Sequence, residues 1–218
     1  NQTARRRPDA PFQIATWDTL RGREKPPGDL VIPDECHSSL AKSRKAILLD
    51  RYRDSVIVGM SATPCRTDDV DMRELYDDIV VVANYMELVS EHFLVAPRVF
   101  STEKLPDVSR VKKKGGDYDS DELAAVCNTA ALKGDIVEHY LRRGEGRPAL
   151  GFACNIAHSE ALAETFVKAG VRCEHVDGNT PTDIRDDILR RLSSGALDVV
   201  WNCQLLGEGV DLPVVKAV

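Results

Sequence analysis

The chain has 218 residues, of which 43% are hydrophobic and 29% are charged, and its formal net charge is −6. This composition supports a folded core in one large domain or two small ones. It excludes a membrane-spanning segment, because no apolar stretch approaches the roughly 20 residues that a bilayer requires. The negative charge argues against a protein that coats nucleic acid non-specifically, although local basic patches can still bind phosphates.

The cysteines indicate a reducing environment. Six are present, and no two of them form a CxxC pair, so the sequence does not predict a zinc site. Cys154, Cys173 and Cys203 lie in or beside predicted buried strands, where free thiols are the expected state. No apolar signal-peptide region follows the arginines at residues 5–7. We therefore expect a cytoplasmic protein.

Short apolar runs alternate with amphipathic runs in the first half of the chain. Strands are predicted at residues 12–17, 30–34 and 56–61. Helices are predicted at residues 39–53, 70–78 and 85–93. Short, continuously apolar strands separated by helices are typical of a parallel sheet that is covered on both faces. The first half therefore predicts an α/β domain.

The second half repeats this pattern. Strands are predicted at residues 149–154, 171–176 and 197–201, and helices at residues 157–169 and 180–192. Thr180 is predicted to cap the last helix, with Pro181 in its first turn and Asp183 completing a capping box.

The stretch between the two halves is polar. Residues 112–119 are rich in lysine and glycine and predict a flexible loop. Residues 97–101 suit the first strand of the second half, so we place the boundary near residue 95. The predicted domains are residues 1–95 and 96–218.

Two acidic residues follow the predicted strand at residues 30–34. Asp34 and Glu35 stand where parallel sheets place their ligands, and paired carboxylates with retained waters suit Mg²⁺. The alternative is an acidic helix start, which the helix dipole favours. Ser61 and Thr63 end a later strand, and they could belong to the same site or simply to a turn before proline.

Five segments together resemble the motifs of superfamily 2 helicases. Residues 31–37, Val-Ile-Pro-Asp-Glu-Cys-His, resemble the Walker B box in its DEAH/DECH form, and residues 59–66, Gly-Met-Ser-Ala-Thr-Pro-Cys-Arg, resemble motif III. The segments that resemble motif Ib, the stretch after motif IV and motif V are residues 14–20, residues 175–181 with Arg185, and residues 205–213. Their order and spacing match the branch of XPB-like DNA helicases and restriction-type translocases.

This resemblance implies two RecA-like parallel-sheet domains of the α/β class, the first truncated at its N-terminus and the second at its C-terminus. The chain contains no GxxxxGK(S/T) phosphate loop and no arginine-rich motif VI. We expect both in N- and C-terminal segments of the same polypeptide that this sequence lacks. In the family, ATP binds in the cleft between the two domains.

The resemblance also implies a role for each matching residue in the first domain. Asp34 would hold Mg²⁺ through water, and Glu35 would orient and deprotonate the attacking water. His37 would act with them and couple the nucleotide site to Ser61 and Thr63, which link hydrolysis to domain motion.

Further matching residues would contact nucleotide or nucleic acid. Gly209 and Asp211 would face the nucleotide, with Asp211 near the ribose. Thr19, Gly178 and Thr180 would lie on the nucleic-acid side, where backbone amides near Gly178 and the following helix start could seat a phosphate.

The expected function is that of an ATP-dependent helicase or translocase, an ATP hydrolase with Mg²⁺ as cofactor. DNA is the expected partner, with RNA as the alternative, and no membrane partner is expected. The second hypothesis is an ATPase-inactive nucleic-acid-binding or regulatory module. It is motivated by the missing phosphate loop and by two departures from the motifs, Pro33 and Gly207. Alone, the 218-residue chain is expected to hydrolyse ATP weakly or not at all.

Overall fold

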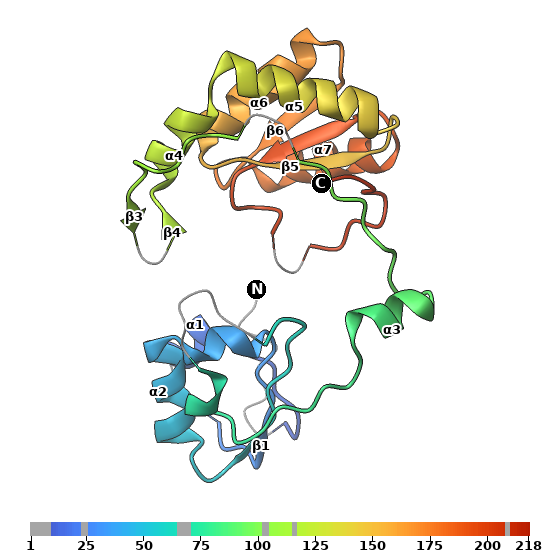
Figure 1. Ribbon diagram of the computed structural model, residues 1–218. Coiled ribbons are helices and arrows are strands. Elements are labelled where there is room, and N and C mark those ends of the chain that lie inside the picture. The colour runs from blue at the N-terminus through green and yellow to red at the C-terminus, as the bar shows by residue number, and fades with distance from the viewer. Residues whose placement is uncertain (1–9, 23–25, 65–70, 102–104, 115–116, 208–209) are drawn as a thin grey trace. The chain divides into compact units, whose positions relative to one another are not determined.

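The computed structural model describes residues 10–22, 26–64, 71–101, 105–114, 117–207 and 210–218. The chain divides into two compact units, residues 1–96 and 97–218, which Figure 1 colours from blue to green and from green to red. Each unit contains a parallel sheet flanked by helices, so the predicted α/β class is confirmed. Among the described residues, no helix combines the length and apolar character needed to cross a membrane.

The first unit is built around two short parallel strands. Strand β1 (Leu30–Val31) pairs with β2 (Val56–Ile57), and the connection between them contains the 3-10 helix η2 (Cys36–Leu40) and helix α2 (Lys42–Arg51). Along the chain, α1 (Trp17–Arg21) precedes these strands, and the 3-10 helix η3 (Met72–Glu74) and α3 (Tyr85–Ser90) follow them.

Contacts between the two strands continue beyond their regular ends. The backbone N–H of Val58 donates to Val31 O at 3.0 Å, that of Met60 donates to Pro33 O at 3.0 Å, and that of Cys36 donates to Met60 O at 2.9 Å. Pro33 has no N–H to donate, which explains why regular strand pairing ends at Val31. The Pro33 carbonyl still accepts the hydrogen bond from Met60 N. The departure at Pro33 therefore shortens the strand without separating the two motif segments that follow.

Helix α2 covers one face of this small sheet. Its buried residues Ile47 and Leu48, with Tyr52, pack against Trp17 and Val31 and against the other members of the cluster, Leu20, Ile57 and Leu75. Five strand-region residues have side chains that are 47–63% exposed: Leu30, Ile32, Val56, Val58 and Met60. The first unit consequently has a small core that lies to one side of its strands.

The second unit has a larger sheet with helices on both faces. Its strands β5 (Ala149–Phe152), β7 (Val199–Asn202) and β6 (Cys173–Val176) are parallel and lie in that order. Figure 1 shows α5 (Ala130–Arg143) and α6 (Ile156–Lys168) stacked over one face. Helix α7 (Thr182–Ser193) packs on the other face through Ile188 and Leu192. The prediction of a sheet covered on both faces is confirmed for this unit.

The central strand β7 is buried along its whole length. Trp201 packs edge-on against Phe166 with ring centroids 5.4 Å apart. Asn202, which is fully buried, donates from Nδ2 to Gly151 O at 2.9 Å, and its Oδ1 accepts from Leu206 N at 3.0 Å. A satisfied buried amide of this kind fixes the chain where it leaves the strand.

Some predicted elements were wrong. Residues 12–17 do not form a strand: Phe12 and Ile14 are 91% and 104% exposed, and the Thr16 hydroxyl caps α1 instead. In the described part of residues 70–78, only η3 is helical. Residues 112–119 contain a hairpin of β3 (Lys113–Lys114) and β4 (Asp117–Tyr118) in place of a flexible loop, with residues 115 and 116 outside the described ranges.

Helix α4 (Ser120–Cys127) and helix α5 were not predicted. Each begins after a side-chain cap, Asp119 for α4 and Thr129 for α5, and these caps were the signals available in the sequence.

His158 gives the second unit an expected sensitivity to acid. It is 5% exposed, and neither ring nitrogen has a hydrogen-bond partner among the described residues. Burial lowers its pKa, with a smaller contribution from Lys133. The folded state therefore favours neutral His158, whereas an unfolded chain binds a proton below a pH of about 6.5. Stability should be fully present above that pH and fall as the pH decreases below it.

The expected result is a loss approaching about 1.4 kcal/mol per pH unit below pH ~6.5, measured by urea unfolding. His158→Leu should flatten this dependence, while the matched removal of an exposed imidazole in His92→Asn should preserve it. An unchanged pH dependence in His158→Leu would contradict the assignment.

Candidate functional site

The two predicted motifs of the first unit lie side by side. Strands β1 and β2 are parallel, so the segments that leave their carboxyl ends emerge at the same edge of the sheet. The hydrogen bond from Cys36 N to Met60 O holds these segments together at 2.9 Å. The residues after Pro33 therefore face those after Met60.

Glu35 has an unusual backbone conformation. Its φ and ψ are 47° and 52°, in the left-handed region, which typically costs a non-glycine residue about 1–3 kcal/mol. Its N–H donates to Oδ1 of Asp34 at 2.9 Å. Both side chains are exposed. Such a conformation persists only when its surroundings hold it, and here it turns two adjacent carboxylates outward at the start of η2.

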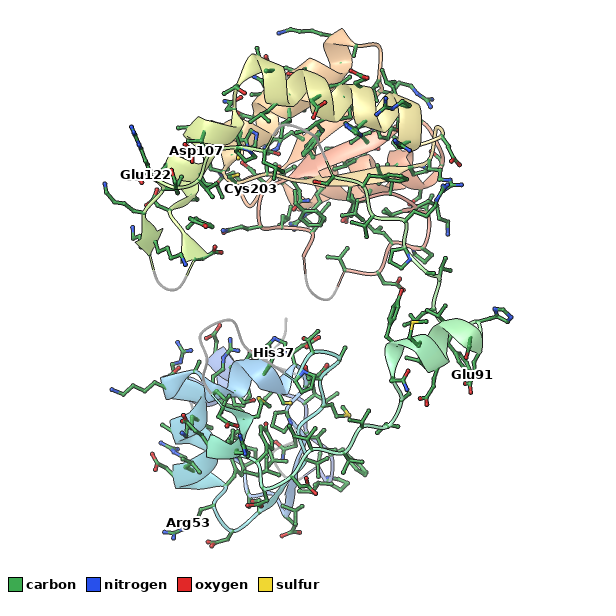
Figure 2. The ribbon with its side chains drawn as sticks, in the orientation of Figure 1. His37, Arg53, Glu91, Asp107, Glu122 and Cys203 are labelled. Atoms are coloured by element: carbon green, nitrogen blue, oxygen red, sulfur yellow. The ribbon has the colours of Figure 1, made fainter. Side chains whose placement is uncertain are left out.

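His37 connects the acidic pair to the second motif. Its Nδ1 lies 3.0 Å from Ser61 Oγ and 3.4 Å from Glu35 Oε2. Ser61 Oγ also accepts a hydrogen bond from Thr63 N at 3.1 Å. Figure 2 labels His37, which projects from the 3-10 turn of η2. The structure thus brings together Asp34, Glu35, His37, Ser61 and Thr63, while their chemical roles remain proposals.

Close packing of Cys36 against Gly59 supports this arrangement, and sequence reasoning missed it. A Cβ added at Gly59 would lie 2.7 Å from Cys36 Cβ and 2.7 Å from the ring of Tyr76. Burial raises the pKa of both the Cys36 thiol and the Tyr76 phenol. Glycine inside an apolar strand pattern is a known signal of close approach, so position 59 could have indicated this contact.

Gly59→Ala should therefore weaken the first unit and disturb the histidine contact. We expect a loss of about 1–3 kcal/mol, because the added methyl group overlaps Cys36 and Tyr76. Urea unfolding of the chain would measure it. Gly28→Ala is the matched control, since its added Cβ would meet nothing closer than 3.7 Å. Equal stability of the two variants would show that the packing at position 59 is loose.

Thr180 does not cap helix α7, contrary to the prediction. The helix starts at Thr182 with Pro181 at its N-cap position and no side-chain cap. Thr180 instead folds back on Asp177: its hydroxyl donates to Asp177 Oδ1 at 3.2 Å and accepts from Asp177 N at 2.9 Å. The reason is that the Thr180 hydroxyl finds hydrogen-bond partners on Asp177 within the turn, and these compete with the N–H groups at the start of α7.

Asp177 organises the turn that contains Gly178 and Thr180. Its Oδ1 accepts from the N–H groups of Asn179 and Thr180 at 2.8 and 3.0 Å. Burial alone would raise the Asp177 pKa, but the hydrogen bonds from Asn179 and Thr180 outweigh it and leave the pKa lowered. The backbone N–H groups of Asn179 and Thr180 are consequently occupied within the turn, whereas the predicted contact of a phosphate with the Gly178 N–H stays a prediction. The sequence Asp-Gly-Asn-Thr signals such a turn.

Three further residues were predicted to contact nucleotide or nucleic acid: Thr19, Gly209 and Asp211. Thr19 is in α1, where its hydroxyl accepts a hydrogen bond from Thr16 at 3.1 Å. Asp211 is exposed, and Gly209 lies outside the described residues. The predicted site residues divide between the two units. The second unit contains Gly178, Thr180 and Asp211, and the first contains Thr19, Asp34, Glu35, His37, Ser61 and Thr63.

The second unit also has a cavity that the sequence did not reveal. Its volume is about 350 Å³, and it lies where β5 and β7 end, next to the start of α6. Cys154, Asn155 and Cys203 line it, with Asp121 of α4, whose Oδ1 accepts from Asn155 Nδ2 at 2.8 Å. Burial and the neighbouring Cys127 raise the pKa of Cys154 to about 11. Cys203 is labelled in Figure 2.

The donor set suits a metal ion shared with a ligand. Among the described residues, no three His, Cys, Asp or Glu side chains gather in a way that could hold a metal by themselves. The pair Asp34 and Glu35 offers two exposed carboxylates. Mg²⁺ commonly takes one or two carboxylates and completes its shell with water and phosphate oxygens, so these residues fit it.

Comparison with protein families identifies the second unit. Residues 132–218 match the helicase conserved C-terminal domain. This range begins inside α5 and extends past β7, so the parallel sheet and the Asp177 turn both lie within the match.

Individual relatives extend the similarity to most of the chain. A Saccharomyces cerevisiae protein provisionally described as ATP-dependent helicase IRC3 is 28% identical over 199 residues, 87% of this chain and 29% of the relative. UvrABC system protein B of Chlorobium chlorochromatii is 28% identical over 203 residues, 87% of this chain and 27% of the relative. The chain therefore spans less than a third of the length of either protein.

A solved structure shares the fold. A fragment of a protein provisionally described as the HsdR subunit of a type I restriction enzyme, from Vibrio vulnificus, superposes with a TM-score of 0.57. The identity is 19%, and the match covers 86% of this chain and 36% of the other.

Proposed function

We propose that the complete protein hydrolyses ATP and uses the energy to move along nucleic acid, because this chain belongs to the superfamily 2 helicases. The observation that carries this proposal is the contact of 3.0 Å between His37 and Ser61, which links the acidic pair to the second motif. A solvated acidic turn would not need a partly buried connection of this kind. The chain spans less than a third of the length of the two curated relatives, so this activity is proposed for a whole protein that contains the chain.

The residues of the first unit would divide the chemistry among them. Mg²⁺, when bound, would supply positive charge to the phosphates. Asp34 would hold it through water, with one carboxylate oxygen already oriented by Glu35 N. The exposed carboxylate of Glu35 would accept a proton from the attacking water.

His37, Ser61 and Thr63 would pass a change at the acidic pair to the rest of the protein. Any movement of Glu35 alters its 3.4 Å contact with His37, and His37 in turn bonds Ser61. Ser61 receives the Thr63 N–H, so the turn before Pro64 would shift with it. This sequence of contacts supports a coupling role.

The nucleic-acid partner is proposed to be DNA, with RNA as the alternative, in the cytoplasm. Thr19, Gly178 and Thr180 would face it, and Gly209 and Asp211 would face ATP. The preference for DNA rests on the resemblance to the branch of XPB-like DNA helicases and restriction-type translocases. Contacts of this kind go to the sugar-phosphate backbone, so little base specificity is expected.

An ATPase-inactive module is the alternative, favoured by the departures at Pro33 and Gly207. Pro33 removes a backbone donor beside the acidic pair. Gly207 is exposed, with open space around its Cβ direction, and offers no side-chain contact to a phosphate.

A phosphate-release assay separates these functions. The complete protein, incubated with Mg²⁺ and ATP, should show turnover that single-stranded or duplex DNA stimulates, while the 218-residue chain alone should show little or none. Parallel reactions with RNA decide the nucleic-acid class. Absence of turnover in the complete protein, combined with DNA binding that is indifferent to ATP, would establish the inactive module instead.

A further inference from the structure

A chain of polar side chains runs from the interior of the second unit to the turn at residues 177–180. Ser159 Oγ of α6 lies 2.6 Å from His175 Nδ1. The other ring nitrogen, Nε2, lies 3.6 Å from Asp177 Oδ2. Ser159 is fully buried, and the side chains of His175 and Asp177 are 16% and 10% exposed. His175 therefore bridges helix α6 and the turn.

Hydrogen-bond chemistry gives this chain a direction. The Asp177 carboxylate only accepts, so a favourable contact with Nε2 requires a proton on Nε2. A neutral imidazole carries one N–H, which leaves Nδ1 of His175 as the acceptor and the Ser159 hydroxyl as the donor. The direction is thus Ser159 to His175 to Asp177, because the acceptor-only carboxylate of Asp177 selects the tautomer and the Ser159 hydroxyl adapts to it.

The arrangement is not a nucleophile site. Serine, histidine and aspartate in sequence are typical of hydrolases, but Ser159 has no exposed surface, so its Oγ cannot reach a substrate. The exposed end of the chain is the turn: Gly178 and Asn179 are both exposed. These three side chains can therefore act on a ligand only through the shape of that turn.

The turn depends on one orientation of Asp177. While Oδ2 lies toward His175, Oδ1 accepts from Asn179 N and Thr180 N. Gly178 then occupies the tip, where an added Cβ would meet nothing within 4 Å. A bare backbone at an exposed tip can approach a phosphate closely. A rotation of Asp177 would release both amides and change this tip.

We infer that His175 is a positioning residue for nucleic-acid binding, which holds Asp177 in the orientation that shapes the turn at residues 177–180. This inference rests on the proposed function, in which Gly178 and Thr180 face nucleic acid. His175 itself touches Ser159 and Asp177, so its effect on a bound strand passes through the turn.

Two substitutions separate the two ends of the imidazole. His175→Gln keeps an amide donor near the position of Nε2 and can still contact Asp177. His175→Asn keeps an acceptor near Nδ1 for Ser159 but removes the imidazole contact of Asp177 Oδ2, which then retains, among the described residues, only Asn179 Nδ2 at 3.4 Å. A residue that merely filled space would respond to both changes alike, so the pair distinguishes positioning from packing.

Binding of the 218-residue chain to a fluorescein-labelled oligothymidylate of about 20 nucleotides is the first measurement. His175→Gln should keep the wild-type Kd. His175→Asn should raise the Kd about tenfold, because the turn at residues 177–180 would no longer be shaped to contact a phosphate. Amide hydrogen exchange is the second measurement. Asn179 and Thr180 should exchange at least about tenfold faster in His175→Asn, while Val200 in the central strand stays protected in both variants.

The tautomer supplies a third measurement. Nitrogen chemical shifts of His175 should show the proton on Nε2 in the wild type. A proton on Nδ1, or unchanged exchange of Asn179 and Thr180 in both variants, would overturn the inference. If the wild-type chain fails to bind the oligonucleotide, the proposed nucleic-acid contact fails, while hydrogen exchange still decides whether His175 positions the turn.

Discussion

Replacing Glu35 with Gln should lower nucleic-acid-stimulated ATP hydrolysis by the complete protein about 10²–10⁴-fold, the usual contribution of a general base. Gln keeps the size and a polar end but cannot accept a proton from water. ATP binding should survive, because the binding residues are unchanged. The left-handed backbone at Glu35, with φ 47°, and the hydrogen bond of its N–H to Asp34 do not depend on the carboxylate.

The control for this experiment is Glu91→Gln, which changes an exposed glutamate at the end of α3. It removes the same charge elsewhere in the first unit and should leave turnover unchanged. Phosphate release measures turnover, and a fluorescent ATP analogue measures binding. Wild-type turnover in Glu35→Gln would exclude Glu35 as the proton acceptor.

Replacing Gly151 with Ala should destabilise the second unit by about 3 kcal/mol, at the upper end for an added methyl group in a packed core. Gly151 and Trp201 are register partners on adjacent parallel strands. A Cβ at position 151 would lie 2.3 Å from the indole ring. The ring cannot retreat easily, because Phe166 packs against it with centroids 5.4 Å apart.

Urea unfolding followed by tryptophan fluorescence would measure this loss. The matched control is Gly134→Ala, inside helix α5, where an added Cβ meets nothing within 4 Å. Alanine in an open helix interior should stabilise by about 0.5–1 kcal/mol, so the two substitutions should have opposite signs. A Gly151→Ala variant as stable as the wild type would show that the Trp201 ring has room to move.

The second unit was largely predictable because its patterns are long and continuous. The predicted helix at residues 157–169 appears as Ile156–Lys168, and the predicted strand at residues 171–176 appears as Cys173–Val176. Helix α6 buries an apolar set against the sheet, and β6 buries Cys173 and Val176 within that sheet, so local pattern and tertiary packing agree. Residues 12–17 have a similar local pattern, but Phe12 and Ile14 are 91% and 104% exposed, and only Trp17 packs against the core.

The candidate site was predictable in composition but not in geometry. Motif order indicated that Asp34, His37 and Ser61 act together, and parallel strands place them at one edge. The left-handed Glu35 could not be read from the sequence, because contacts with a strand about 25 residues away hold it. Thr180 was misassigned for the related reason that a turn and a helix cap compete for the same hydroxyl.

The order β5-β7-β6 also determines when the second sheet can form. Among the described strands of this sheet, the one synthesised last lies in the middle, so β5 and β6 pair with no other strand until Val199–Asn202 becomes available. A growing chain that has reached only β6 exposes apolar strand edges and cannot bury them locally. Closure of the sheet should then be a single late and cooperative event, and during synthesis this portion depends on the completion of its central strand for protection against aggregation.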